Sequence, residues 1–146
     1  MLRSGLTNAL IGGGAGNGVM TLGMTYAAPM GMGMEMDMAG MLSSGLGTGY
    51  GFGLALHLAL GIIIFPLIYV YVVYDRLRGP PIVRGLIWGI ALWLAADLVV
   101  MPLLGAGFLM SNIGGWAAVL ASLAAHMIYS GLLGAIAGGG AVVAQD

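Results

Sequence analysis

The stretch GFGLALHLALGIIIFPLIYVYVVY, residues 51–74, contains no acidic residue, no lysine and no arginine. A helix needs about 20 apolar residues to cross the roughly 30 Å hydrocarbon core of a bilayer, so this stretch is long enough to span a membrane. Three further long apolar stretches cover residues 4–30, 83–108 and 115–138, and the second of these contains Arg84 and Asp97. The pattern predicts an all-α membrane protein, with four transmembrane helices in a single domain of residues 1–146.

The composition supports a membrane location. Only 6% of the 146 residues are charged and the mean hydropathy is +1.05, whereas soluble domains carry charge on about a quarter of their residues. The formal net charge of −1 leaves no basic patch for nucleic acid, and the absence of cysteine excludes disulfides and thiolate metal sites. Membrane lipid is therefore the expected surrounding of the chain.

Basic residues set the expected orientation. All four are arginines: Arg3 precedes the first span, and Arg76, Arg78 and Arg84 lie between the second and the third. Since basic residues favour the cytoplasmic side of a membrane, both termini are predicted to be cytoplasmic. The methionine-rich segment 31–49 is then predicted to be an outer loop.

Glycines dominate the first span. Gly12 and Gly16 form one pair spaced four residues apart, and Gly14 and Gly18 form a second, overlapping pair. Because glycine has no side chain, two backbones can approach closely at such pairs, which promotes helix packing in lipid. The pattern predicts close packing of this span against its neighbours.

The two halves of the chain resemble each other weakly. Each begins with arginine followed within two residues by Gly-Leu, and each has a proline near the outer end of its first helix, Pro29 and Pro102. Each second helix carries one histidine, His57 and His126. A parallel repeat of this kind predicts two αα-hairpins related by a pseudo-twofold axis along the membrane normal. The alternative is chance similarity between glycine-rich apolar helices.

Two histidines and one aspartate are the ionisable groups expected deep in the membrane. The pseudo-twofold axis would make His57 and His126 face each other, and two facing imidazoles can bind a b-type haem from both sides or hold copper or zinc. Alternatively, they bridge helices as neutral hydrogen-bonding groups. Asp97 is expected to orient a histidine or to pass protons. Its alternative role is a protonated group bonded to a backbone carbonyl or to a serine such as Ser122.

Methionines alternate through the predicted outer loop. Thioether sulfur is a soft ligand suited to Cu(I), so the run is a candidate copper site. Packing against a partner or lipid and redox buffering by sulfoxide formation are the alternatives. Asp37 is expected to start a short amphipathic helix over residues 36–42. The candidate copper ligands are Met30, Met32, Met34, Met36, Met38 and Met41.

Several segments together resemble an uncharacterised family of small four-span bacterial integral membrane proteins. The resemblance covers roughly Gly5 to Gly138. It implies a four-helix fold in the bacterial inner membrane but no established activity, and some such proteins look like companions of respiratory oxidases. The segments that carry it are MEMDMAGML (34–42), the span around His57, WGIALW (88–93), VVMPLLGAG (99–107) and AHMIY (125–129).

These observations lead to three functional hypotheses. The first is an accessory integral membrane subunit of a bioenergetic, respiratory oxidase-type complex, packed on a larger core subunit. The second is a redox protein that binds haem b or copper through His57 and His126. The third is a small oligomeric proton or ion transporter. No reaction machinery is recognisable, so we do not expect an enzyme with its own soluble substrate, although a non-catalytic subunit of an oxidoreductase complex fits.

Overall fold

The computed structural model describes residues 2–33 and 36–142, and every regular element in these ranges is helical. Most elements join end to end into four long helices, which cover residues 2–32, 50–76, 81–103 and 115–142. In chain order the elements are α1 (Leu2–Leu22), η1 (Gly23–Ala27), α2 (Ala28–Met32), α3 (Met38–Gly45), α4 (Tyr50–Ala59), η2 (Leu60–Ile64), α5 (Phe65–Ile68), η3 (Tyr69–Val73), η4 (Tyr74–Arg76), α6 (Pro81–Ala95), η5 (Ala96–Val100), α7 (Met101–Leu103), η6 (Phe108–Met110) and α8 (Gly115–Val142).

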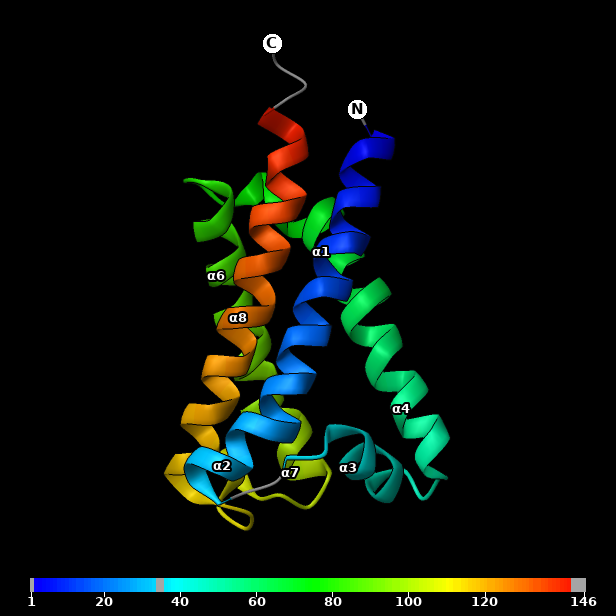
Figure 1. Ribbon diagram of the computed structural model, residues 1–146, viewed down its shortest axis with the longest axis vertical. Coiled ribbons are helices and arrows are strands. Elements are labelled where there is room, and N and C mark those ends of the chain that lie inside the picture. Colours follow the sequence, from blue (N-terminus) through cyan, green and yellow to red (C-terminus); the bar gives the residue numbers. More distant parts are fainter. Residues whose placement is uncertain (1, 34–35, 143–146) are drawn as a thin grey trace.

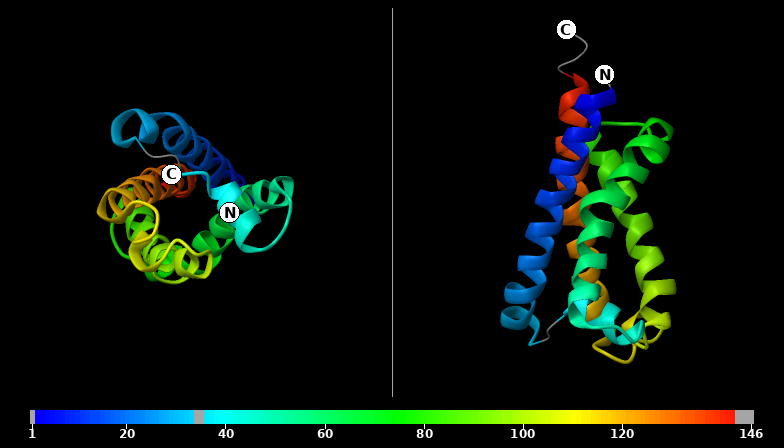
Figure 2. Two further views of the ribbon diagram at one scale, coloured as in Figure 1. Left: turned by 90° about the horizontal axis from the view of Figure 1, so that it is seen from below. Right: turned by 90° about the vertical axis from the view of Figure 1, so that its right-hand side faces the viewer.

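The long helices run along the longest dimension of the molecule (Figure 1, Figure 2). Both termini lie at one end, together with the connection between η4 and α6. At the opposite end α3 lies across the bundle, close to the connection between α7 and α8 (Figure 1). The methionine-rich segment and the arginine-bearing connection thus occupy opposite ends of the molecule.

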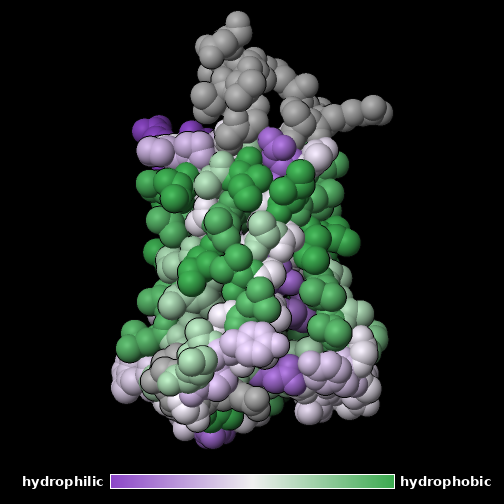
Figure 3. All heavy atoms as spheres, viewed as in Figure 1, coloured by the Kyte–Doolittle hydropathy of each residue, from purple (hydrophilic) through white to green (hydrophobic). Residues whose placement is uncertain are grey.

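Three of the long helices are long and apolar enough to cross a membrane: Tyr50–Arg76, Pro81–Leu103 and Gly115–Gly138. An apolar band covers the middle of the face seen in Figure 3, and hydrophilic residues gather at its two ends. The first long helix, predicted as a span over 4–30, is not among the three. Its many glycines, with Asn8, Asn17 and several threonines, lower its hydropathy.

α8 is the central helix. Half of its apolar window is buried (50%), against 17% for Tyr50–Arg76, because α8 packs along both α1 and α6. Glycines make the contact with α6 close. A Cβ added at Gly85 would lie 2.2 Å from the carbonyl oxygen of Ser130 and 2.8 Å from the Cα of Gly134. Backbones that touch in this way gain packing that lipid cannot supply.

The predicted glycine pairs of α1 behave differently from each other. A Cβ at Gly16 would lie 2.6 Å from the carbonyl oxygen of Tyr129, and one at Gly12 would lie 3.1 Å from the Cα of Leu133. This pair packs directly on α8, as predicted. Gly14 and Gly18 would meet nothing within 4 Å, so the second pair faces away from the described part of the chain.

Prolines account for most of the departures from regular α-helix. Proline lacks the N–H that would bond to the carbonyl four residues earlier, and its ring crowds that carbonyl. A wider π-helical turn relieves the crowding. Three π-helical segments end two residues before a proline: η1 before Pro29, η2 before Pro66 and η5 before Pro102. The fourth, η3, has no proline in that position.

Two local features bear on the predicted boundaries. Asp37 caps α3, because its Oδ1 accepts a hydrogen bond from the backbone N–H of Gly40 at 3.0 Å. The predicted role of Asp37 in starting the helix is confirmed, but the helix covers Met38–Gly45 instead of 36–42. The third long helix, expected to continue to residue 108, ends at Leu103 instead. Gly105 and Gly107 have φ values of 85° and 79°, which are incompatible with a continuing right-handed helix.

The packing is less symmetric than a pseudo-twofold repeat requires. Such an axis would relate the first long helix to the third and the second to the fourth. The close pairing of α1 with α8 would then be matched by a pairing of α6 with α4, which is not among the closely packed pairs of the described residues. The two-hairpin repeat therefore stays a prediction.

The close approach of α6 and α8 predicts the effect of adding one methyl group. Gly85→Ala should lower the free energy of unfolding by about 1–3 kcal/mol, because the new methyl overlaps backbone atoms of α8. The matched control Gly14→Ala adds the same group where nothing lies within 4 Å and should be neutral or stabilising. Thermal unfolding in detergent measures both. Equal melting temperatures for the two variants would contradict the close α6–α8 contact.

Candidate functional site

A pocket of about 430 Å³ lies among the long helices, and α3 borders it at the end opposite the termini. Every long helix contributes to its lining. The three π-helical segments that precede prolines all do so, through residues such as Met24, Gly61 and Val100. The proline-induced widening therefore occurs where the helices surround the pocket.

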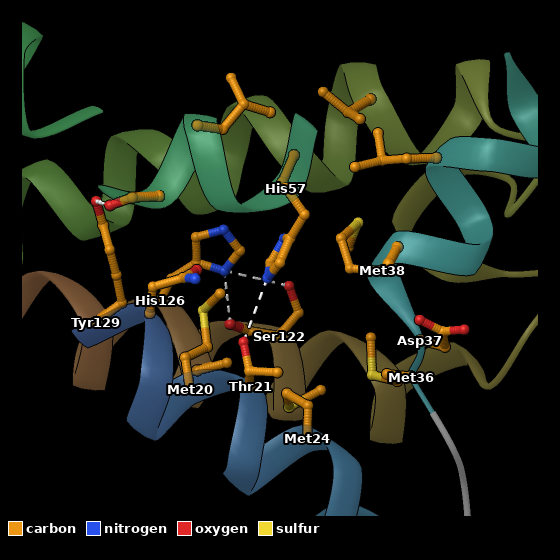
Figure 4. Close-up of a pocket in the computed structure, with 18 of the residues that line it drawn as sticks. Met20, Thr21, Met24, Met36, Asp37, Met38, His57, Ser122, His126 and Tyr129 are labelled. Atoms are coloured by element: carbon orange, nitrogen blue, oxygen red, sulfur yellow. Dashed lines mark hydrogen bonds between the residues drawn. The ribbon is translucent and has the colours of Figure 1, made fainter. Parts of the chain in front are cut away.

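Both histidines line this pocket, His57 from α4 and His126 from α8 (Figure 4). They come from different helices, and Figure 4 shows both imidazoles pointing into the same space. The Nε2 of His57 lies 3.3 Å from the hydroxyl oxygen of Thr21 on α1. This contact is long for a hydrogen bond to a hydroxyl, so a ligand can compete for the nitrogen.

The His126 ring is held by its own helix. Its Nδ1 lies 2.8 Å from the backbone carbonyl oxygen of Ser122, one turn earlier. Because a carbonyl oxygen can only accept, Nδ1 must carry a proton and donate it. In a neutral imidazole the other nitrogen, Nε2, then keeps its lone pair. This is the arrangement by which proteins orient a histidine for metal binding.

Ser122 connects His126 to Asp97. The Ser122 hydroxyl donates to Oδ1 of Asp97 at 2.9 Å, and its oxygen lies 3.5 Å from Nδ1 of His126. Asp97 lies in η5, has an exposed fraction of 0% and does not line the pocket. Of the partners proposed from the sequence, the structure pairs it directly with Ser122 and only indirectly with His126. Serine stands between carboxylate and histidine here, so the trio is not a hydrolytic triad, in which histidine takes that place.

Asn17, Gly61 and Tyr129 meet at another part of the pocket wall. The Tyr129 hydroxyl donates to the carbonyl oxygen of Gly61 at 2.7 Å. A Cβ at Gly61 would lie 2.4 Å from Oδ1 of Asn17, so only glycine fits there. Asn17 is 2% exposed and its Oδ1 has no hydrogen-bond partner among the described residues. This wall is tightly packed around polar groups.

Thioether groups form much of the remaining lining. They come from three separate parts of the chain, the first long helix, the segment around α3, and α7. The lining methionines are Met20, Met24, Met36, Met38 and Met101. In Figure 4, Met20 and Met38 lie beside the two histidines, and Met24 and Met36 lie farther along the pocket toward Asp37.

The structure divides the predicted run of copper-binding methionines. Met36 and Met38 line the pocket, and Met41 does not. Met38 and Met41 both pack on the apolar cluster that includes Met36, Met101 and Met110. Met30 is 89% exposed and lies outside the pocket. Met32 is the last residue of α2. Met34 lies outside the described residues. The copper site predicted from the run therefore stays a prediction.

Charge is almost absent from the lining. Asp37 is the one formally charged residue in it, and its Oδ1 accepts a long hydrogen bond of 3.4 Å from the Tyr50 hydroxyl. Arg84 lies at the other end of the bundle, where it donates to the carbonyl oxygens of Gly79 and Tyr74 at 2.8 Å and 3.1 Å. An anionic ligand would find no basic partner in this pocket, so its burial would leave an unpaired negative charge, which is costly. A neutral or cationic ligand does not have this cost.

Several lining residues were not singled out from the sequence. Thr21 and the helical methionines Met20 and Met24 belong to a span that was interpreted only as a packing element. Met20 and Met24 are spaced four residues apart, which places two side chains on the same face of a helix. That spacing, in a span expected to adjoin the His57 helix, was the sequence signal that could have identified Met20 and Met24 as lining residues.

The chain belongs to a family of unknown function (DUF6789), whose family model matches residues 4–141. This confirms the predicted membership of an uncharacterised family, over nearly the same residues. Comparisons with curated proteins and with solved structures found no match. The function is therefore inferred from the geometry of the pocket.

The buried Asp97–Ser122 bond predicts an energetic coupling between these two residues. Single and double alanine variants at both positions should show a coupling of about 0.5–3 kcal/mol in the free energy of unfolding. Removing either side chain leaves the buried polar group of the other without its partner. A matched cycle of Asp97 with Ser44, an exposed residue outside the pocket, should be additive within about 0.5 kcal/mol. Thermal unfolding in detergent gives both cycles, and additive Asp97 and Ser122 effects would refute the bond.

Proposed function

We propose that this chain is a four-span protein of the bacterial inner membrane that serves as an accessory subunit of a respiratory oxidase-type complex. In this proposal its pocket holds a cofactor or metal ion between His57 and His126. The observation that carries it is the convergence of the chain's two histidines, from α4 and α8, in one pocket among apolar helices. Intramembrane ionisable residues rarely persist without a functional role.

The four-span topology is supported by the packing of the first long helix. It is as long as the three apolar helices and lies along the central helix α8 through Gly12 and Gly16. A helix packed on a buried partner needs less apolar surface than one facing lipid on all sides, so its lower hydropathy is compatible with spanning. The arginines at one end then favour a cytoplasmic position for both termini.

A non-catalytic role is supported by the chemistry around the pocket. Ser122 donates to Asp97 and is buried, so it is not a nucleophile activated by His126. The transporter hypothesis gains less support, because Asp97 does not line the pocket and thus offers no step in an ion path through it. A resident ligand held by two histidines fits the pocket better.

Cysteine labelling tests the topology, since the chain has no cysteine of its own. In intact cells a membrane-impermeant maleimide should label Leu46→Cys, near the end of α3. It should not label Asp75→Cys or a cysteine added ahead of residue 1 until the membrane is permeabilised. The added cysteine reports on the first long helix. If it reacted in intact cells, that helix would not span and the termini would lie on opposite sides.

Mild-detergent purification of the tagged chain from its native membrane tests the functional proposal. We expect larger membrane subunits of an oxidase-type complex to co-purify, together with a metal or a visible absorbance. His57→Gln and His126→Gln should each lose the metal or absorbance while keeping the partners, because the ligand atoms lie in the pocket and not at the outer surface. The exposed Ser44→Ala variant, outside the pocket, should behave as wild type. A colourless, metal-free and partner-free protein would contradict the proposal.

A further inference from the structure

We infer that the ligand of this pocket is a single Cu(I) ion, held by the imidazoles of His57 and His126, with thioether sulfurs of Met20, Met24 and Met38 sharing the coordination positions that the imidazoles leave. The inference rests on the proposed function, in which the two histidines hold a ligand, and it names that ligand. It differs from the copper site expected in the outer loop. Two of its three methionines come from the first long helix, and Met30 is excluded by its position outside the pocket.

The donor set determines the class of metal. Thioether and imidazole are soft or borderline ligands, which favour Cu(I) over the hard cations that require carboxylate and carbonyl oxygens. Within the described residues no group of three histidine, aspartate or glutamate side chains converges. Zinc and non-haem iron sites usually need such a group. What the pocket offers instead is two imidazoles with several thioethers.

The charge of the ion also matters. The energy needed to move an ion from water into a low-dielectric interior is large and, in the Born treatment, rises with the square of the charge. The desolvation energy of a monovalent ion is therefore much smaller than that of a divalent ion. Asp37, at the N-terminus of α3, supplies the one negative formal charge of the lining, and no positive formal charge opposes the ion there.

Haem fits the same pocket less well. Haem carries two propionates, and the lining contains Asp37 but no arginine or lysine to pair with them. Burying unpaired carboxylates is costly, and Asp37 would add repulsion. His57 and His126 thus fit a small cation better than an anionic macrocycle.

The surroundings allow the ligands to adjust around an ion. Methionine is unbranched and flexible, so its sulfur can reach a shared point from several backbone positions. Met20 and Met24 lie one turn apart on the first long helix, while Met38 opens α3 at the pocket's edge. On the other side the Nδ1–H of His126 is already engaged with the Ser122 carbonyl, which leaves Nε2 for the metal.

A Cu(I) competition experiment tests the inference. The purified full chain, in detergent under anaerobic reducing conditions, is titrated with Cu(I) in the presence of a chromophoric Cu(I) chelator. We expect about one Cu(I) per chain. The variants Met20→Leu, Met24→Leu, Met38→Leu and His126→Gln should each weaken binding about tenfold or more. Methionine-to-leucine changes conserve volume and should preserve the fold, which the melting temperature checks.

Met30→Leu is the matched control, because it removes a thioether that is 89% exposed and should leave Cu(I) affinity unchanged. If the chain takes no Cu(I) but purifies with haem that is lost in His57→Gln, this inference is overturned while the proposed function stands. If Cu(I) binds equally to wild type and to all pocket variants, the copper is adventitious and the inference is overturned. If no ligand of any kind depends on either histidine, both proposals are overturned.

Discussion

The close contact of α8 with its two neighbours is the constraint on which the pocket depends. In lipid, apolar surface alone gives helices little reason to associate, so contact between small residues must hold the bundle together. Gly85 and Gly134 bring α6 against α8, and Gly12 and Gly16 bring α1 against it. α4 is held mainly through α3 and through its continuation η2 and α5 against α1. The second long helix therefore packs on α1 mainly through η2 and α5, and the pocket is lined both by this part and by α4.

Prolines are associated with two of the buried polar contacts around this space. Each of Pro29, Pro66 and Pro102 follows a π-helical turn that lines the pocket or adjoins its wall. Within η5 the widened turn carries Asp97, whose carboxylate reaches Ser122 on α8, and within η2 it leaves the Gly61 carbonyl to accept from Tyr129. The same Ser122 holds the His126 ring through its backbone carbonyl. Helix widening, buried hydrogen bonds and the orientation of His126 thus form one connected arrangement.

Much of this architecture was accessible from the sequence, for reasons that are local. Long apolar stretches with few charges predicted the apolar helices, Asp37 predicted the start of α3, and the Gly12/Gly16 spacing predicted a packing face. What the sequence did not reveal depends on contacts between distant segments. The uneven pairing of the helices follows from which glycine face meets α8, and nothing within α1 distinguishes Gly12/Gly16 from Gly14/Gly18. For the same reason Met20 and Met24 were not recognised as lining the same pocket as His57, and the alternating loop methionines were treated as one set.

The central claim is that His57 and His126 share one intramembrane ligand with thioether groups. X-ray absorption spectroscopy at the copper edge of the Cu(I)-loaded chain tests it most directly, because nitrogen and sulfur neighbours are distinguishable there. The account predicts a mixed shell of imidazole nitrogen and thioether sulfur that loses nitrogen in His126→Gln and sulfur in Met20→Leu. A shell of nitrogen or oxygen alone, or a spectrum that is unchanged in both variants, would contradict it.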